Sequence, residues 1–124
     1  MPGCTACGLL LVSDISNPTH LDPSDSFARQ HVARSALEDA YAAAQQRVRQ
    51  LQHHPEGWGY AGCTVECIET HISWLLLVGG HVYKFKKPLA LDFLDFSTAA
   101  LRLAACQEEL RINRRTAPAL YLGL

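Results

Sequence analysis

Apolar and polar positions alternate most clearly between residues 65 and 87, where two apolar stretches rich in β-branched and aromatic side chains flank Gly79-Gly80. Because two glycines accommodate the positive φ angles of a tight turn, this pattern predicts a β-hairpin. Side chains alternate between the two sides of a strand, so Lys84 and Lys86 in the second arm face the same side. The hairpin is therefore predicted to present two lysines to one face of a sheet.

A helical pattern follows the hairpin and carries the acids that such lysines need. An inward-facing ammonium requires an anionic partner, and Glu108 and Glu109 both lie within this pattern. Ser97 or Thr98 is expected to cap the helix, which continues toward residue 115. The expected core face of this helix consists of Leu101, Ala105 and Ile112.

An earlier helix is predicted from residue 35 to about residue 53. Ser35 and Glu38 have the spacing of a capping box. Apolar side chains then recur at intervals of three and four, at Leu37, Tyr41, Ala44, Val48 and Leu51. A glycine-rich connector follows the helix, and its aromatic residues Trp58 and Tyr60 are expected to fold back onto the core.

The chain divides into three parts on these patterns. Residues 1–34 are rich in proline and small polar residues and are expected to be poorly ordered, with only Leu9 to Val12 able to pair as a strand. Residues 35–62 form the first helix and the connector, and residues 63–124 form the sheet and the second helix. The apolar run at 119–124 predicts one more strand, and its position at the end of the sequence suggests a truncated product.

Charge and hydropathy exclude several classes of protein. The formal net charge is −1 over 124 residues, which gives no reason to expect nucleic acid as a partner. The longest apolar runs, Gly8 to Val12 and Ile72 to Val78, are too short to span a bilayer, so no membrane partner is expected. No charged region precedes Gly8, so we expect no secretory signal and a cytoplasmic location.

The cysteines leave a zinc module open as an alternative. Two of the five cysteines form a CxxC pair and two form a CxxxC pair, at Cys4, Cys7, Cys63 and Cys67. Four thiolates at such spacings can hold a structural zinc ion. However, Cys67 enters an apolar strand, whereas a zinc knuckle favours tight polar turns. Reduced, partly buried thiols are therefore the preferred interpretation, with no metal site.

The order of elements has a specific chemical use. A turn between two strands can cover the phosphates of a nucleoside triphosphate, and a strand lysine can contact them while a helix carboxylate orients its ammonium. Phosphoryl transfer depends largely on such positioning and charge neutralisation. The alternative is structural: a lysine-rich edge strand that discourages aggregation, followed by a helix with a solvated acidic and basic face.

A resemblance favours the nucleotide interpretation, and five blocks in order carry it. They are IETHISW (68–74), YKFKKP (83–88), FLDFST (93–98), EELRINRR (108–115) and APALYLG (117–123). Residues 65–124 resemble the N-terminal part of bifunctional aminoglycoside phosphotransferase-like and ATP-binding proteins of bacteria. The resemblance implies an α+β fold: an incomplete protein-kinase-like small lobe, built from an antiparallel β-hairpin sheet and one helix.

The resemblance also implies the roles of individual residues. Lys84 corresponds to the phosphate-binding lysine, with Lys86 as the alternative, and Glu109 is its helix partner, with Glu108 still open. The turn over the phosphates spans residues 69–73, and its expected ATP-binding residues are Thr70, His71 and Ser73. That turn lacks the glycines of a glycine-rich phosphate-binding loop, so Thr70 and Ser73 could equally be ordinary turn residues.

The implied function is nucleotide binding without catalysis by this chain alone. ATP and Mg²⁺ are the expected cofactors, but the catalytic aspartate and the magnesium ligands of a kinase-like protein belong to a large lobe beyond residue 124. No catalytic or metal-ligating residue is assigned within the chain, and the phosphoryl acceptor is not predicted. The remaining alternative is a non-catalytic interaction fragment that self-associates through the uncovered face of its sheet.

Overall fold

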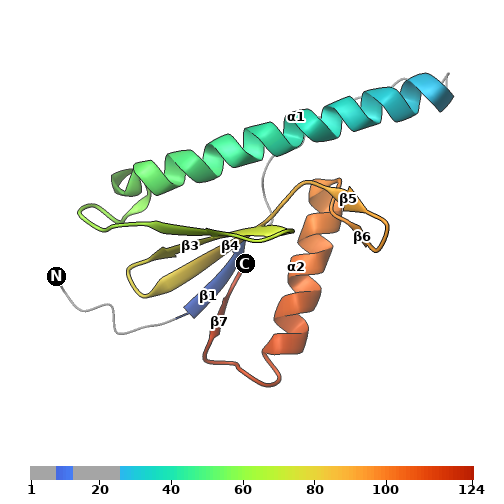
Figure 1. The fold of residues 1–124 in the computed structure, drawn as a ribbon. Helices are drawn as coiled ribbons and strands as arrows, with labels where there is room; N and C mark the ends of the chain where they lie inside the picture. Colours follow the sequence, from blue (N-terminus) through green and yellow to red (C-terminus); the bar gives the residue numbers. More distant parts are fainter. Residues whose placement is uncertain (1–7, 13–25) are drawn as a thin grey trace.

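A mixed sheet with one helix on each side forms the fold in the computed structural model, which describes residues 8–12 and 26–124 (Figure 1). The elements in chain order are β1 (Gly8–Val12), α1 (Ser26–His53), a 3₁₀ helix (Pro55–Trp58), β2 (Glu66–Glu69), β3 (Ser73–Val78), β4 (His81–Lys86), β5 (Ala90–Leu91), β6 (Leu94–Asp95), α2 (Ala99–Asn113) and β7 (Tyr121–Gly123). The described part of the chain is therefore an α+β fold with two α-helices.

The sheet combines antiparallel and parallel pairing. Its strand order is β2-β3-β4-β1-β7, with β3 antiparallel to both of its neighbours. The predicted hairpin is confirmed: β3 and β4 are joined through Gly79 and Gly80, whose φ angles are 56° and 78°. β1 lies between β4 and β7 and is parallel to both, so the sheet is mixed rather than purely antiparallel.

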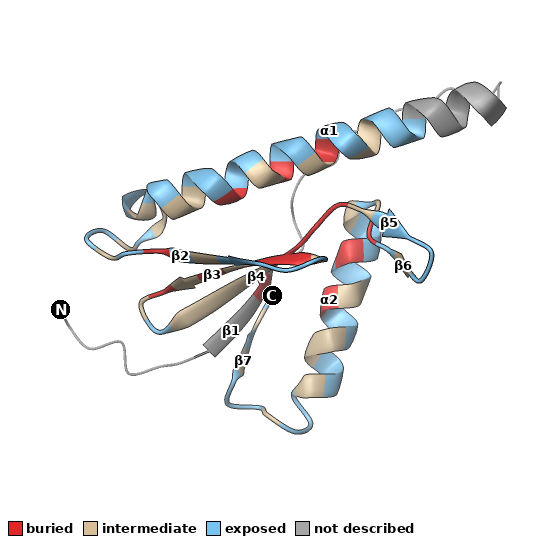
Figure 2. Cartoon of the chain, viewed as in Figure 1, coloured by how far each residue is buried: buried red, intermediate tan, exposed pale blue. Residues whose placement is uncertain are grey.

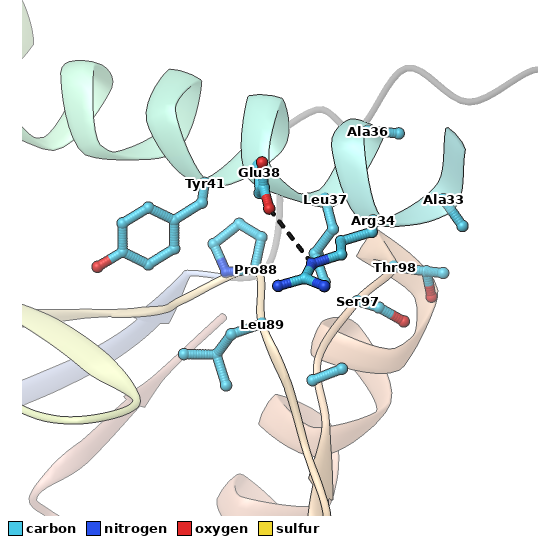
Figure 3. A pocket seen from close by; sticks show the side chains of 11 residues that line it. Ala33, Arg34, Ala36, Leu37, Glu38, Tyr41, Pro88, Leu89, Ser97 and Thr98 are labelled. Atoms are coloured by element: carbon cyan, nitrogen blue, oxygen red, sulfur yellow. Dashed lines mark ion pairs between the residues drawn. The ribbon is translucent and has the colours of Figure 1, made fainter. Parts of the chain in front are cut away.

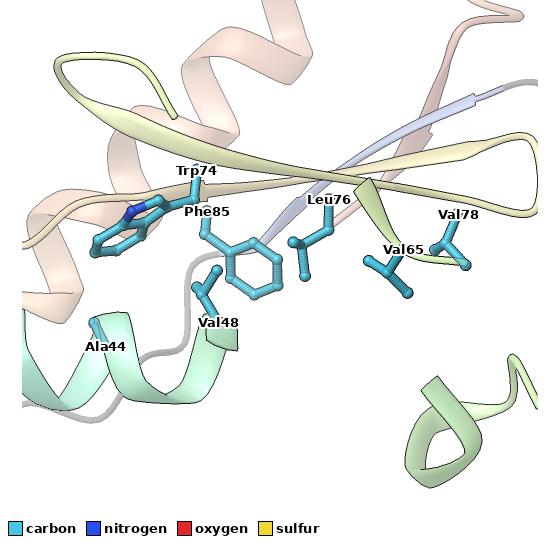
Figure 4. Close-up of a cluster of buried hydrophobic side chains, with 7 residues drawn as sticks. All are labelled: Ala44, Val48, Val65, Trp74, Leu76, Val78 and Phe85. Atoms are coloured by element: carbon cyan, nitrogen blue, oxygen red, sulfur yellow. The ribbon is translucent and has the colours of Figure 1, made fainter. Parts of the chain in front are cut away.

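The main hydrophobic core lies between the sheet and α1 (Figure 4). Its buried members are Ala44, Val48, Val65, Trp74, Leu76, Val78 and Phe85. Trp74, Leu76 and Val78 alternate along β3, so one side of that strand is entirely buried against the helix. Figure 2 shows the buried positions of α1 as a stripe on the side that faces the sheet, while its opposite side is exposed.

The first helix begins earlier than predicted. It starts at Ser26 rather than at Ser35, so the capping-box prediction is wrong. Residues 26–34 contain neither proline nor glycine, and the helix continues through Ser35, which is exposed. Glu38 pairs instead with Arg34, with 3.5 Å between their charged atoms.

Parts of the segment 1–34 that was expected to be poorly ordered form regular structure. The strand predicted at Leu9 to Val12 is confirmed as β1, and the beginning of α1 also lies in this segment. The other positions, 1–7 and 13–25, lie outside the described residues. β1 is thus part of the sheet despite its distance in sequence from its partner strands.

The second helix has the predicted cap but a different buried face. Thr98 is the N-cap, and its side chain accepts a hydrogen bond of 3.1 Å from the Leu101 amide. The predicted core face is wrong, because Leu101 and Ile112 are 40% and 49% exposed, whereas Arg102 and Cys106 are buried. This face of the sheet carries lysines, so polar side chains of the helix find partners there.

The connectors add smaller packing units to this framework. As predicted, Trp58 and Tyr60 pack against the main core, and the Trp58 indole donates to the Leu51 carbonyl at 2.9 Å. The apolar segment after Pro88 forms the short hairpin of β5 and β6. Among the residues that the structure describes, no helix has the length and hydropathy needed to cross a membrane.

Candidate functional site

Glu109 of α2 binds two lysines of β4 at once. Its two carboxylate oxygens accept hydrogen bonds from Lys84 at 2.8 Å and from Lys86 at 2.7 Å. The alternation of β4 directs both lysines toward α2, and the helix brings the carboxylate opposite them. The predicted contact between Lys84 and a helix acid is therefore confirmed.

The electrostatics of this cluster keep Glu109 ionised. Burial by itself would raise the pKa of Glu109, but the hydrogen bonds from Lys84 and Lys86 and their positive charges outweigh burial and lower it. One carboxylate between two ammonium groups leaves a local excess of one positive charge. Such an excess, partly shielded from water, favours a further anion.

The two lysines differ in their access to solvent. The Lys84 side chain retains 23% of its exposure, whereas that of Lys86 retains 5%. Lys86 also lies over the Phe96 ring, with its Nζ atom 5.2 Å from the ring centre. Of these two lysines, Lys84 is therefore the one that can reach a ligand while it stays bonded to Glu109.

Glu108 takes no part in this cluster. It pairs with Arg111 on the exposed side of α2, at 2.8 Å from Nε and 2.6 Å from Nη2. The hydrogen bonds from Arg111 lower the pKa of Glu108 at the surface. The alternative between the two acids is thus decided in favour of Glu109 as the partner of Lys84.

The turn between β2 and β3 is closed by its own hydrogen bonds. The Ser73 amide donates to the Thr70 hydroxyl at 3.0 Å, and the Thr70 amide donates to the Ser73 carbonyl at 2.9 Å. The Ser73 side chain lies on the same sheet face as Lys86, because the two residues pair directly across β3 and β4. Its hydroxyl is buried and has no hydrogen-bond partner within the described part of the chain.

A further buried lysine, Lys87, forms an ion pair on the other side of this turn, and the sequence pattern did not reveal this pair. Lys87 donates to the Glu69 carboxylate at 2.6 Å and to the Thr70 carbonyl at 2.7 Å. Its side chain is only 5% exposed. Because Lys87 follows the last residue of β4, strand alternation gives no prediction for its direction. Its immediate neighbour Pro88 is the only local signal that the strand ends there.

The predicted site residues therefore separate into two groups. Lys84, Glu109 and Ser73 lie on the face of the sheet that α2 covers. The exposed residues Thr70 and His71 instead line a polar pocket of about 670 Å³, together with Tyr41, Glu69 and Lys87. The turn forms the boundary between the two groups.

An apolar strip adjoins Lys84 on its sheet face. Ile68, Leu75 and Lys84 pair in one row across β2, β3 and β4, so their side chains share that face. Ile68 is 44% exposed, and Leu75 is half-buried. The row places an accessible apolar surface beside a solvent-reaching cation.

A separate apolar groove of about 870 Å³ lies between α1 and the segment that joins β4 to α2 (Figure 3). Leu37 and Tyr41 of the helix face Pro88 and Leu89 across it. None of the predicted site residues lines this groove. It was not anticipated from the sequence, because it depends on how far α1 extends beyond the sheet.

The four cysteines of the alternative zinc site lie in two separate parts of the chain. Cys4 and Cys7 lie outside the described residues. Cys63 and Cys67 pack against the main core, and burial raises the pKa of the Cys67 thiol. Within residues 8–12 and 26–124, no group of three metal-ligating side chains comes together.

Comparison with known proteins finds similarity to slightly less than half of the chain. Uncharacterized proteins of Mycobacterium bovis and of two strains of Mycobacterium tuberculosis are 42% identical to it over 60 residues, which is 48% of this chain. The matched segment is 12% of the length of each of these relatives. No model of a protein family matches the chain, and no solved structure matches it.

Proposed function

We propose that this chain forms the ATP-binding small-lobe portion of an aminoglycoside phosphotransferase-like protein with a kinase-like fold. The observation that carries the proposal is the hydrogen bond between Lys84 and Glu109. It supplies a strand lysine held by a helix carboxylate, which is the arrangement that protein kinases use to contact nucleotide phosphates. A cytoplasmic location belongs to the same proposal.

The chemistry of the cluster suits a polyphosphate ligand. An ammonium group has three donors, so Lys84 can contact phosphate oxygens while Glu109 still orients it. The Ser73 hydroxyl lies on the same sheet face but is buried, so we assign it no contact with the ligand. The strip of Ile68 and Leu75 offers an apolar surface for the base.

The proposal assigns no catalytic step to this chain. Glu109 lies between two lysine ammonium groups, and their positive charges disfavour Mg²⁺ at its carboxylate. The described residues contain no other cluster that fits this cation. In a kinase-like protein the magnesium ligands and the aspartate that accepts the substrate proton belong to the large lobe, so the proposal assigns neither of them to this chain.

A titration with Mg-ATP tests the proposal. Binding is followed by the fluorescence of Trp58 and Trp74 and by thermal stability, and we expect saturable binding that Lys84→Ala abolishes. Arg111→Ala is the control, since it removes an exposed cation that forms an ion pair with Glu108 on the surface of α2. Binding by Lys84→Ala at the wild-type affinity would refute the proposed role of this lysine.

Exposed apolar side chains favour a second candidate, a non-catalytic interaction fragment. Phe93, between β5 and β6, is 83% exposed, and Ile112 and Leu122 are 49% and 43% exposed. Apolar side chains mark an association surface when they form one contiguous exposed patch. Sedimentation velocity at micromolar concentration tests self-association, which Phe93→Ser should weaken. A monomer at all concentrations would count against this candidate.

A further inference from the structure

The turn between β2 and β3 is held from the side of the sheet that α1 covers. Lys87 contacts the two residues that lead into the turn. Its ammonium group donates hydrogen bonds to the Glu69 carboxylate and to the Thr70 carbonyl. Its own amide donates to the Ile72 carbonyl at 2.8 Å, on the other limb of the turn. One residue thus bonds to the turn through its side chain and its backbone.

The position of the Lys87 ammonium is strongly constrained. Its Nζ atom lies 5.2 Å from the ring centre of Trp74 and 5.9 Å from that of Tyr41, a residue of α1. Aromatic faces attract an ammonium, and the attraction grows as water is excluded. The Lys87 side chain is only 5% exposed, so its buried charge depends on the Glu69 carboxylate and the Thr70 carbonyl for compensation.

We propose that Lys87 is a positioning residue that fixes the turn between Thr70 and Ser73 for nucleotide binding. This inference rests on the proposed function, because it names what holds the segment expected to cover the phosphates. Lys84 and Lys87 then have different roles on opposite sides of the sheet. Lys84 contacts the ligand, and Lys87 holds the backbone that closes over it.

The alternative role, in which Lys87 itself binds an anion in the polar pocket beside it, fits the geometry less well. Two acceptors lie within 2.7 Å of its Nζ atom, and two aromatic rings flank it. The pocket also carries the Glu69 carboxylate, which is 53% exposed and would repel an anion. The ammonium is therefore already neutralised where a ligand would meet it.

Glu69→Gln is the main test variant, because Glu69 is half-exposed and its replacement should leave the fold intact. Glu66→Gln is the matched control, with the same substitution at an exposed position of the same strand. Lys87→Met is a second variant that removes the ammonium and keeps an apolar side chain between the rings. Amide hydrogen exchange of Ser73, followed by NMR without nucleotide, reports on the turn, and the Leu76 amide reports on the core.

We expect Ser73 to exchange about tenfold faster in Glu69→Gln and in Lys87→Met, because both variants remove the ion pair between Lys87 and Glu69 that holds the entrance of the turn. Exchange of Leu76 should not change in Glu69→Gln, and neither amide should change in Glu66→Gln. We expect the affinity for Mg-ATP to fall by about tenfold in Glu69→Gln, since the covering turn is no longer pre-organised.

Each other outcome overturns a distinct part of the inference. Unchanged exchange at Ser73 would show that Lys87 does not hold the turn, whatever the nucleotide does. Faster exchange of the Ser73 amide with an unchanged affinity for Mg-ATP would show that Lys87 fixes the turn but that the turn does not affect nucleotide binding. If the wild-type chain binds no Mg-ATP, the proposed function fails and the effect on affinity falls with it, while the exchange data still decide whether Lys87 fixes the turn.

Discussion

The Glu109 carboxylate of α2 lies 2.8 Å from the Lys84 ammonium of β4 and joins the second helix to the lysine-bearing face of the sheet. The same carboxylate also holds Lys86, which is 5% exposed and would otherwise be a buried charge without compensation. This contact therefore serves the packing of α2 as well as the proposed ligand site. The two contributions can be measured separately.

Glu109→Gln should destabilise the chain by about 2 to 4 kcal/mol, because two lysines, one of them buried, lose their counter-ion. Glu108→Gln is the control at the neighbouring position, and its exposed pair with Arg111 should contribute far less because solvent screens it. Urea unfolding followed by circular dichroism measures both. Equal effects of the two variants would contradict the importance of the buried cluster.

The contribution of Glu109 should also depend on pH. The lysines hold the pKa of this carboxyl in the folded chain below its ordinary value of 4.5, so the stabilisation is complete above that pH. As the pH falls through the folded-state pKa, the unfolded chain binds the proton more readily and the stabilisation is lost. The difference in unfolding free energy between wild type and Glu109→Gln should therefore shrink in acid. A difference that stays constant down to the acid limit of the fold would contradict this prediction.

Tyr83 should ionise at unusually high pH. Burial and its hydrogen bond with the Tyr60 hydroxyl raise the pKa of Tyr83 to about 12. Stability from this group is complete below the ordinary tyrosine value of 10.0 and is lost as the pH rises through the folded-state pKa. Phenolate absorbance after a pH jump, recorded before unfolding, should show this late step, and Tyr83→Phe should remove it. Tyr121→Phe, at the sheet edge, should leave the step in place.

Leu76 should be one of the most costly positions of the core. Its side chain is fully buried between the sheet and α1, so Leu76→Ala should destabilise the chain by about 2 to 5 kcal/mol. Leu103→Ala is the matched control on α2, where the side chain is 39% exposed and the cost should stay below about 1 kcal/mol. Thermal and urea unfolding measure both variants. A small loss at Leu76 would mean that α1 does not pack firmly on the sheet.

Local chemistry made several elements predictable. Gly79-Gly80 specifies a tight turn, Thr98 supplies a side-chain cap, and strand alternation alone places Lys84 and Lys86 on one face. Each of these depends on residues that are neighbours in the sequence. The beginning of α1 was missed for the same reason, since a capping-box spacing at Ser35 is also compatible with the interior of a longer helix.

Long-range packing determined the features that the patterns did not predict. Nothing local indicates that β1 pairs in parallel with β4 and β7, because that choice depends on which strand edge remains open after the hairpin forms. The burial of Arg102 in place of Leu101 likewise depends on which surface α2 meets.

The sequence by itself determined the hairpin, the lysine-bearing face and the approximate start of α2, because periodicity and turn chemistry act over a few residues. Only the tertiary structure decided that Glu109 rather than Glu108 binds Lys84, and that Lys87 contacts Glu69 on the opposite side of the sheet. These choices depend on the rotation of a helix over a sheet and on the path of the chain beyond a strand end. Both are set by packing between segments that are distant in sequence.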